Sequence, residues 1–443
     1  MLTPTTETDD QEPLPERTTL YRSPVECLSG PSLDLGGIHL EVQNIIRSTG
    51  EFVDDLTARY FRDFHSHLPI ISRARFQSNL LATGRPPSAD SSVLLLTICL
   101  IAYLPKLDPL PRDRGTPHIG RQSLYLATKA LLAQVQGSME PSITLIQASL
   151  LLATYEYANR RPQAAVVTIA GCARMAYAAR IHDTRRHDMN GASGLEIEEA
   201  ANTWWGIVIF ERAFNCEVEG DLEQPMATIL PSGDTRLPLD RDILDRSDLD
   251  SPESIPNIPV ACWTTTAVGG FGRAAQASCL LDQVLKGLVM PDLNTRLPLL
   301  ESLDRTLQSF LALIFSHSSP GKMWPCCTAL AITVRTLFTL HNHILNIPHQ
   351  AVSANLRSLA EWKKSSLAAL DTATTMIIDM AKWHSATLPS DGANNTSPIH
   401  IYEIGAAVKH VRTRVHHGDS PWPGGTEEEL RLYMERIQYQ WVA

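Results

Sequence analysis

This chain of 443 residues has only short apolar runs, dispersed cysteines and a net negative charge. The longest apolar runs, at 93–104 and 145–153, fall short of the ~20 residues that a membrane-spanning helix needs. No basic start leads into an apolar stretch at the N-terminus, so the sequence predicts no signal peptide. The formal charge of −10 argues against nucleic-acid binding through bulk electrostatics. We therefore expect an intracellular chain without a membrane segment.

The eight cysteines are dispersed, and only Cys326 and Cys327 are neighbours. Adjacent cysteines rarely bridge each other or hold one metal together. Most of the others have apolar neighbours, which predicts small buried side chains in a reduced compartment. The histidine pairs 65/67 and 341/343 are spaced by two residues, and on a helix such residues point to different sides. The sequence therefore predicts no metal site.

Motifs of catalysis and phosphate binding are also absent: there is no Gly-rich phosphate loop, Gly-x-Ser-x-Gly elbow or His-Glu-x-x-His. We accordingly assign no catalytic residue and no cofactor. The best candidate for an anion site is a basic cluster formed by Lys409, Arg412 and Arg414. A solvated helix end explains the same cluster more simply, because no aromatic residue is interleaved with it.

What the chain does contain is apolar residues at helical spacing, with 44% hydrophobic residues overall. Strand-like alternation competes nowhere, so the predicted fold is all-α, built from packed helical hairpins. A final helix is predicted from a capping box of Thr426 and Glu429. The other predicted helices, besides one that begins at Val42, lie near 119–136, 142–159, 162–182, 261–289, 293–316, 325–346, 353–385 and 398–416.

Composition divides the chain into an arm and a body. Residues 1–41 are rich in proline and acidic residues and predict a flexible arm. Residues 42–443 carry the helical pattern and predict one all-helical domain. Within that domain, residues 240–259 combine acidic residues with prolines, which predicts a solvated loop.

Residues 195–240 form the most informative stretch. Acidic residues open a helix, as the positive end of a helix dipole prefers, and a largely apolar face follows. That face begins with the pair Trp204 and Trp205, and the charged pair Glu211 and Arg212 comes after it. Prolines then force an extended segment that ends in a Leu-Pro-x-Asp sequence at 237–240.

A second pattern lies upstream and consists of Tyr60, Phe61, His65, Pro69, Arg73 and Phe76. The two patterns together resemble the fungal-specific transcription factor domain, the all-helical regulatory region that follows the binuclear zinc cluster in many fungal activators and repressors. The resemblance implies that the residues of both patterns are structural. Asn202 and its two preceding alanines stand where the family often carries arginines.

The resemblance implies a nuclear transcriptional regulator, with a cytoplasmic presence left open. Six closely grouped cysteines of a zinc cluster do not occur in this sequence, so we expect no direct specific DNA binding by this chain. The expected partners are other transcription factors or coregulators, a small-molecule effector, or a homo- or heterodimer mate. Control of a secondary-metabolite pathway is compatible with the resemblance. The alternatives are an enzyme or small-molecule binder repurposed from the same scaffold, and a sequence from which an upstream zinc cluster is missing.

Overall fold

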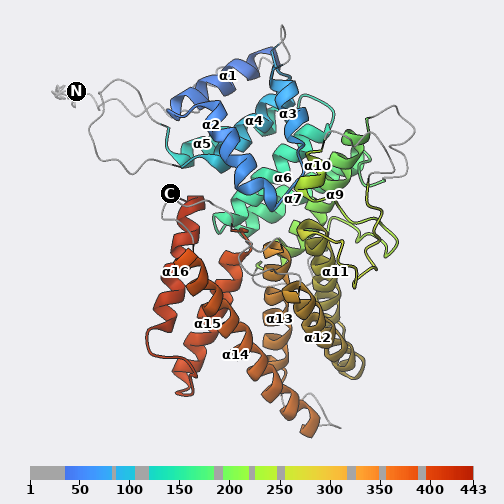
Figure 1. Ribbon diagram of the computed structural model, residues 1–443, viewed down its shortest axis with the longest axis vertical. Helices are drawn as coiled ribbons and strands as arrows, with labels where there is room; N and C mark the ends of the chain where they lie inside the picture. Colours follow the sequence, from blue (N-terminus) through green and yellow to red (C-terminus); the bar gives the residue numbers. More distant parts are fainter. Residues whose placement is uncertain are drawn as a thin grey trace, which may run out of the picture. The chain divides into compact units, whose positions relative to one another are not determined.

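The structure is a computed structural model that describes residues 35–81, 86–104, 119–183, 193–218, 225–246, 255–316, 326–348, 356–387 and 396–442. It is all-helical, as predicted (Figure 1). Within these ranges the only strand-like feature is an isolated bridge between Arg236 and Pro259. None of the described helices combines the length and hydropathy of a membrane span. Residues 1–34 of the predicted arm and 247–254 of the predicted acidic loop lie outside the described residues.

The helix predicted from Val42 is divided into several shorter elements. The first of them, α1, begins earlier, at Leu35, and ends at Ser48, and the next helix begins at Val53. The interruption occurs because Gly50 adopts a φ of 71° and the Thr49 hydroxyl donates to the Ile46 carbonyl. The elements are α1 (Leu35–Ser48), α2 (Val53–Arg62), η2 (Phe64–Ser66), α3 (Arg73–Leu81), α4 (Ala89–Ala102) and α5 (Arg121–Gln136).

The next helices lie where the sequence predicts them and form the centre of the fold. Every residue of α6 from Leu145 onward is buried, because its apolar residues surround the helix instead of forming one stripe. Ser142 caps its first turn, and Pro162 occupies the first turn of the following helix. The elements are α6 (Ile143–Ala158), α7 (Pro162–Ala178) and α9 (Gly194–Asn215).

Helix α13 contacts four of the remaining helices, α11, α12, α14 and α15. The helix predicted at 261–289 begins only at Gly270. Residues 258–261 instead pair with residues 233–237 through backbone hydrogen bonds, such as Leu237 N–H to the Ile258 carbonyl (2.8 Å). The elements are α10 (Arg241–Leu244), α11 (Gly270–Leu288), α12 (Leu293–Ser316), α13 (Cys327–Asn346), α14 (Leu356–Thr387), α15 (His400–His416) and α16 (Thr426–Val442).

The predicted capping box at the last helix is wrong, although the helix is present. The Thr426 hydroxyl donates to the Pro423 carbonyl (2.9 Å), so it does not cap the Glu429 N–H. That N–H donates instead to the Gly425 carbonyl (3.0 Å). One face of this helix is buried, and its members are Leu430, Tyr433, Met434, Ile437 and Trp441.

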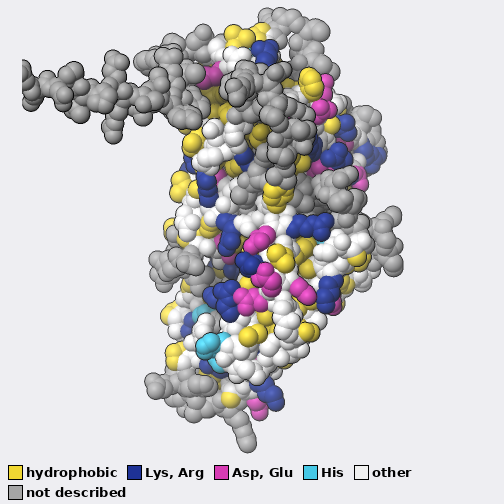
Figure 2. Space-filling model, turned by 90° about the vertical axis from the view of Figure 1, so that its left-hand side faces the viewer, with side chains coloured by type: hydrophobic (Ala, Val, Ile, Leu, Met, Phe, Trp, Pro, Cys, Tyr) yellow, Lys and Arg dark blue, Asp and Glu magenta, His cyan; other side chains and the backbone are white. Residues whose placement is uncertain are grey.

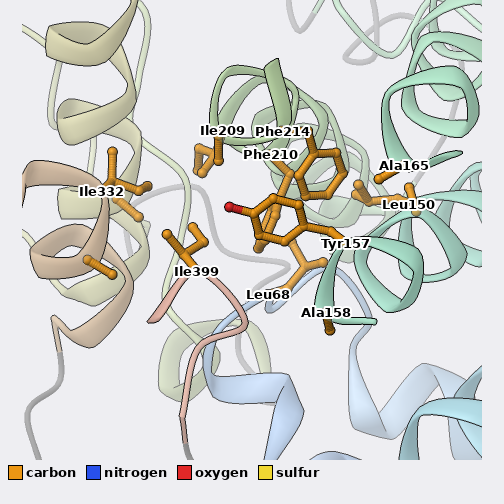
Figure 3. Close-up of a cluster of buried hydrophobic side chains, with 14 of the residues drawn as sticks. Leu68, Leu150, Tyr157, Ala158, Ala165, Ile209, Phe210, Phe214, Ile332 and Ile399 are labelled. Atoms are coloured by element: carbon orange, nitrogen blue, oxygen red, sulfur yellow. The ribbon is translucent and has the colours of Figure 1, made fainter. Parts of the chain in front are cut away.

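The core joins the early and late helices around Tyr157 of α6 (Figure 3). Its ring stacks on that of Tyr402 in α15, with centroids 4.1 Å apart, and lies 4.4 Å from that of Phe214 in α9. The Tyr402 hydroxyl also donates to the Tyr157 carbonyl (2.8 Å). The helices from α1 to α16 therefore share one continuous core.

Candidate functional site

Helix α9 belongs to the pattern at 195–240 and is hydrogen-bonded to the segment that carries the upstream pattern. Its first turn is fixed by a capping box in which Ser193 and Glu196 exchange side-chain and backbone hydrogen bonds. From Glu198 to Phe214 every residue is buried, including the polar ones. Each buried polar group needs a partner, and α9 therefore determines where the neighbouring segments can lie.

Asn202 ties the two patterns together. Its side-chain amide nitrogen donates to the carbonyls of Pro69 (2.6 Å) and Leu239 (2.8 Å). Its amide oxygen accepts from the Leu239 N–H (2.9 Å). The upstream pattern and the Leu-Pro-x-Asp segment are thus held by one side chain. The sequence marked this position only as a departure from the family and gave no indication of its role.

The two glutamates at the start of the helix reach different segments. Glu199 accepts from the Ser72 N–H (2.6 Å) and pairs with Arg75. Burial raises the pKa of Glu199, and the charge of Arg75 acts in the opposite direction. Glu198 pairs with Arg236 (2.6 Å). These acidic residues therefore lie at the helix end that favours them and also make two tertiary contacts.

The tryptophan pair is buried, as its place on the predicted apolar face requires. Trp205 packs in the core and its indole N–H donates to the Arg236 carbonyl (3.0 Å). Trp204 lies edge-on to Tyr177, with ring centroids 5.3 Å apart, and 5.9 Å from His182.

The upstream pattern forms an aromatic cluster. Phe61 lies 5.1 Å from Tyr60, 5.1 Å from His65 and 5.5 Å from Phe76, measured between ring centroids. The guanidinium of Arg73 lies 5.9 Å from the Phe61 centroid, within range of a cation–π contact. The residues of the upstream pattern are therefore spaced in the sequence so that their side chains pack together in the fold.

His65 is neutral inside this cluster. Burial and the nearby charges of Arg241 and Arg73 lower its pKa to about 3. Its Nε2 lies 3.8 Å from the Asp245 carboxylate, but a neutral imidazole forms no ion pair at that distance. His65 therefore acts as a buried aromatic ring and not as a cation.

Glu211 and Arg212 belong to a buried charged network, which we call the Arg212 cluster: Glu211, Arg212, Thr228 and Asp282. The Arg212 guanidinium donates to Glu211 (3.0 Å), the Thr228 carbonyl (3.1 Å) and Asp282 of α11 (3.3 Å). Glu211 also accepts from the Thr228 N–H (3.1 Å). Arg212 is 1% exposed and Asp282 2%. The cluster joins α9, the segment after it and α11, and the sequence predicted neither Thr228 nor Asp282 as partners.

Asp240, the last residue of the Leu-Pro-x-Asp segment, holds the start of α11. Its carboxylate accepts from the Phe271 N–H (2.8 Å), and burial raises its pKa. A Cβ on Gly269 would overlap this carboxylate, so the close approach requires glycine at that position. The segment therefore connects α9 to α11.

The basic cluster near the end of α15 has acidic partners. Arg412 pairs with Glu427 (2.7 Å), and Arg414 pairs with Asp419 (2.5 Å) and Asp371 (3.2 Å). Figure 2 shows basic and acidic side chains interspersed on the side of the molecule that carries α16. This arrangement favours a solvated helix end over an anion site.

The last site is a cavity of about 310 Å³ between α12, α13, α14 and α15. Glu403 is 1% exposed and lines it. The His400 ring donates through Nδ1 to Glu403 Oε1 (2.6 Å). Burial opposes the charge on His400, but Glu403 and Cys327 outweigh it and raise the His400 pKa to about 10. The other lining residues are Phe315, Leu330, Val334, Met376, Ile377, Asp379, Met380 and Trp383.

Across the ranges described, no three His, Cys, Asp or Glu side chains are grouped in a way that would hold a metal ion. The buried polar groups of α9 are bonded mainly to the segments around the helix. These residues hold an all-helical scaffold together.

The family comparison agrees with that class. Residues 57–219 match the family model of the fungal specific transcription factor domain, which confirms the resemblance over this region. The match contains the upstream pattern, α9 and Arg212. Helices α11 to α16 lie beyond it.

Two relatives are transcription factors. The chain is 29% identical over 139 residues to "Transcription factor BOA15" of Botryotinia fuckeliana (strain B05.10), covering 31% of this chain and 73% of that protein. It is 25% identical over 248 residues to "Transcription factor tazR" of Aspergillus terreus (strain NIH 2624 / FGSC A1156), covering 53% of this chain and 38% of that protein. Together with the family match, these relatives support a transcriptional regulator.

Proposed function

We propose that this protein regulates transcription in the nucleus through partner proteins rather than by reading DNA itself. The family match of residues 57–219 is the observation that carries the proposal. The buried state of the motif residues supports it, because Trp205, Glu211 and Arg212 hold helices together and are withdrawn from any substrate. The dispersed cysteines and the charge of −10 support the reliance on partners.

A tethering experiment tests the regulatory role. The full chain is fused to an unrelated DNA-binding domain, and transcription of a reporter gene with the matching operator is measured. We expect the fusion to raise or lower reporter transcription relative to the DNA-binding domain alone. The same reporter without the operator is the control. Unchanged transcription with a folded, nuclear fusion would contradict the proposal.

The proposed reliance on partners has its own test. The purified full chain is titrated with duplex DNA at increasing salt concentration. Contacts to phosphates weaken steeply with salt, so we expect only weak binding that disappears at higher salt. Sequence-selective binding that resists salt would show that the chain reads DNA directly.

We propose that the target genes belong to a secondary-metabolite pathway. This part of the proposal rests on the family resemblance alone. Transcript profiling of a strain without the gene tests this, and a coordinated change in one group of pathway genes is the expected result. Loss of one metabolite without any change in transcripts would instead favour an enzyme built on this scaffold.

A further inference from the structure

We propose that the cavity between α12 and α15 binds an apolar small molecule that carries a hydroxyl or amine group. The regulatory part of this inference, that the molecule acts as an effector, rests on the proposed function. Binding itself can be measured without it. The volume of about 310 Å³ lies at the lower end of the range of small-molecule sites.

The walls determine the apolar character of the ligand. Seven of the nine lining residues are apolar or aromatic, and they come from three helices. Met376 and Met380 are unbranched and flexible, so they can adapt to the shape of a bound molecule. Trp383, 37% exposed, and Asp379, which is exposed, line the side of the cavity that meets solvent. A ligand therefore has a route of entry.

Glu403 determines the polar group. Its Oε1 accepts from His400, whereas its Oε2 is buried and has no hydrogen-bond partner among the described residues. A buried acceptor without a donor is destabilising, and a donor on a ligand would satisfy it. Water is a weaker candidate, because a buried water needs two to four polar partners and these walls are mostly apolar.

The charge of the lining excludes an acidic ligand. Both titratable lining residues, Glu403 and Asp379, are acids, and none of the nine lining residues is a lysine, arginine or histidine. His400 lies against Glu403 and neutralises it in part, so a neutral hydroxyl and an ammonium are both compatible with the site. A carboxylate would face two like charges.

Helix α13 connects the cavity to the family region. Leu330 and Val334 line the cavity. The next residue, Arg335, pairs with Glu217 just beyond the end of α9 (2.6 Å). A ligand that moves α13 would therefore act directly on the segment next to the Arg212 cluster.

The test is a calorimetric titration of the full chain with 1-octanol, octylamine and octanoate, which share one apolar chain. We expect saturable binding of one equivalent of octanol and of octylamine, and binding of octanoate weaker by about tenfold or more. Absence of saturable binding of the first two, or equally tight binding of octanoate, would overturn the proposal.

Two variants that fill the cavity from different helices locate the binding. Met376→Trp and Val334→Phe should each abolish it, whereas Ala368→Trp, at an exposed position of α14, should leave it unchanged. Thermal unfolding is recorded first, and either filling variant that unfolds near the wild-type temperature is sufficient. Binding that survives in a folded filling variant would place the ligand elsewhere and overturn the proposal.

A third variant tests the polar contact. Glu403→Gln keeps the shape and removes the charge, so the preference for octylamine over octanoate should fall by about tenfold. An unchanged preference would show that Glu403 does not contact the ligand. Reporter transcription by the tethered chain is measured separately, so that failure of binding and failure of the regulatory role are distinguishable.

Discussion

Two buried polar sites, one on α9 and one on α15, differ in how completely their groups are hydrogen-bonded. On α9, both polar ends of the Asn202 amide are hydrogen-bonded, and Arg212 donates to its neighbour Glu211 and to Thr228 and Asp282 outside the helix. In α15, Glu403 is as deeply buried but has one bonded oxygen and one that faces no donor. A polar group whose hydrogen bonds are all made within the protein holds its neighbours in place. A group beside a cavity that lacks a hydrogen bond can accept one from a ligand.

The largest expected effect is on the Arg212 cluster. Arg212→Met leaves Glu211 buried without its cation and leaves Asp282 with only the exposed Lys286, and we expect a loss of about 3–5 kcal/mol in the free energy of unfolding. Chemical denaturation measures it. The matched control is Arg431→Met on α16, whose ion pairs are exposed to solvent and screened, so we expect almost no change in stability. Similar losses in both variants would remove the distinction between the cluster and a surface pair.

A smaller loss is expected for the bridge between the two patterns. Asn202→Leu keeps the volume but leaves the Pro69 and Leu239 backbone groups unpaired, which should cost about 2–3 kcal/mol. The control is Asn294→Leu at an exposed position of α12, where we expect almost no change. A nearly neutral Asn202→Leu would mean that the patterns are joined by apolar packing alone.

The two buried histidines predict opposite responses to pH. His65 has a lowered pKa of about 3, so its contribution to stability is present above pH 6.5 and is lost as pH falls toward 3. His400 has a raised pKa of about 10, so its contribution is present below pH 6.5 and is lost as pH rises toward 10. Each proton changes the free energy of unfolding by at most about 1.4 kcal/mol per pH unit.

Denaturation curves across that pH range measure these contributions. His65→Gln should flatten the acidic limb and His400→Gln the alkaline limb. Flattening of the same limb by both buried substitutions would contradict the assigned charge states.

The smallest effect concerns the contact between Asp240 and Gly269. Gly269→Ala should cost about 1 kcal/mol, because the new Cβ displaces the carboxylate from the Phe271 N–H. In an Asp240→Ala background the same change should cost less. Additive losses in the double variant would show that the two residues act independently.

The sequence predicted the helices of this fold better than their partners. The burial of α6 on all sides and the burial of Trp204 and Trp205 follow from where apolar residues stand along the sequence, which is a local property. The late start of α11 could not be predicted in this way, because the pairing of residues 258–261 with 233–237 depends on segments that meet only in the folded chain.

The candidate sites follow the same rule. The upstream pattern was identified by its spacing, but Asp282 and Thr228 are 70 and 16 residues from Arg212 and carry no motif. The cavity was missed for the same reason, since its lining comes from four helices. One local signal was available: His400 and Glu403 are three residues apart, a spacing at which helical side chains can pair.

The central claim is that the motif residues of α9 build a regulatory scaffold, and Glu211→Gln tests it most directly. Reporter transcription by the tethered chain and the folded fraction of the same protein are measured together over a range of temperatures. Because Gln weakens the pairing of Arg212, we predict that transcription falls only as far as the folded fraction falls and recovers on cooling. Loss of regulation in a fully folded Glu211→Gln protein would contradict the account.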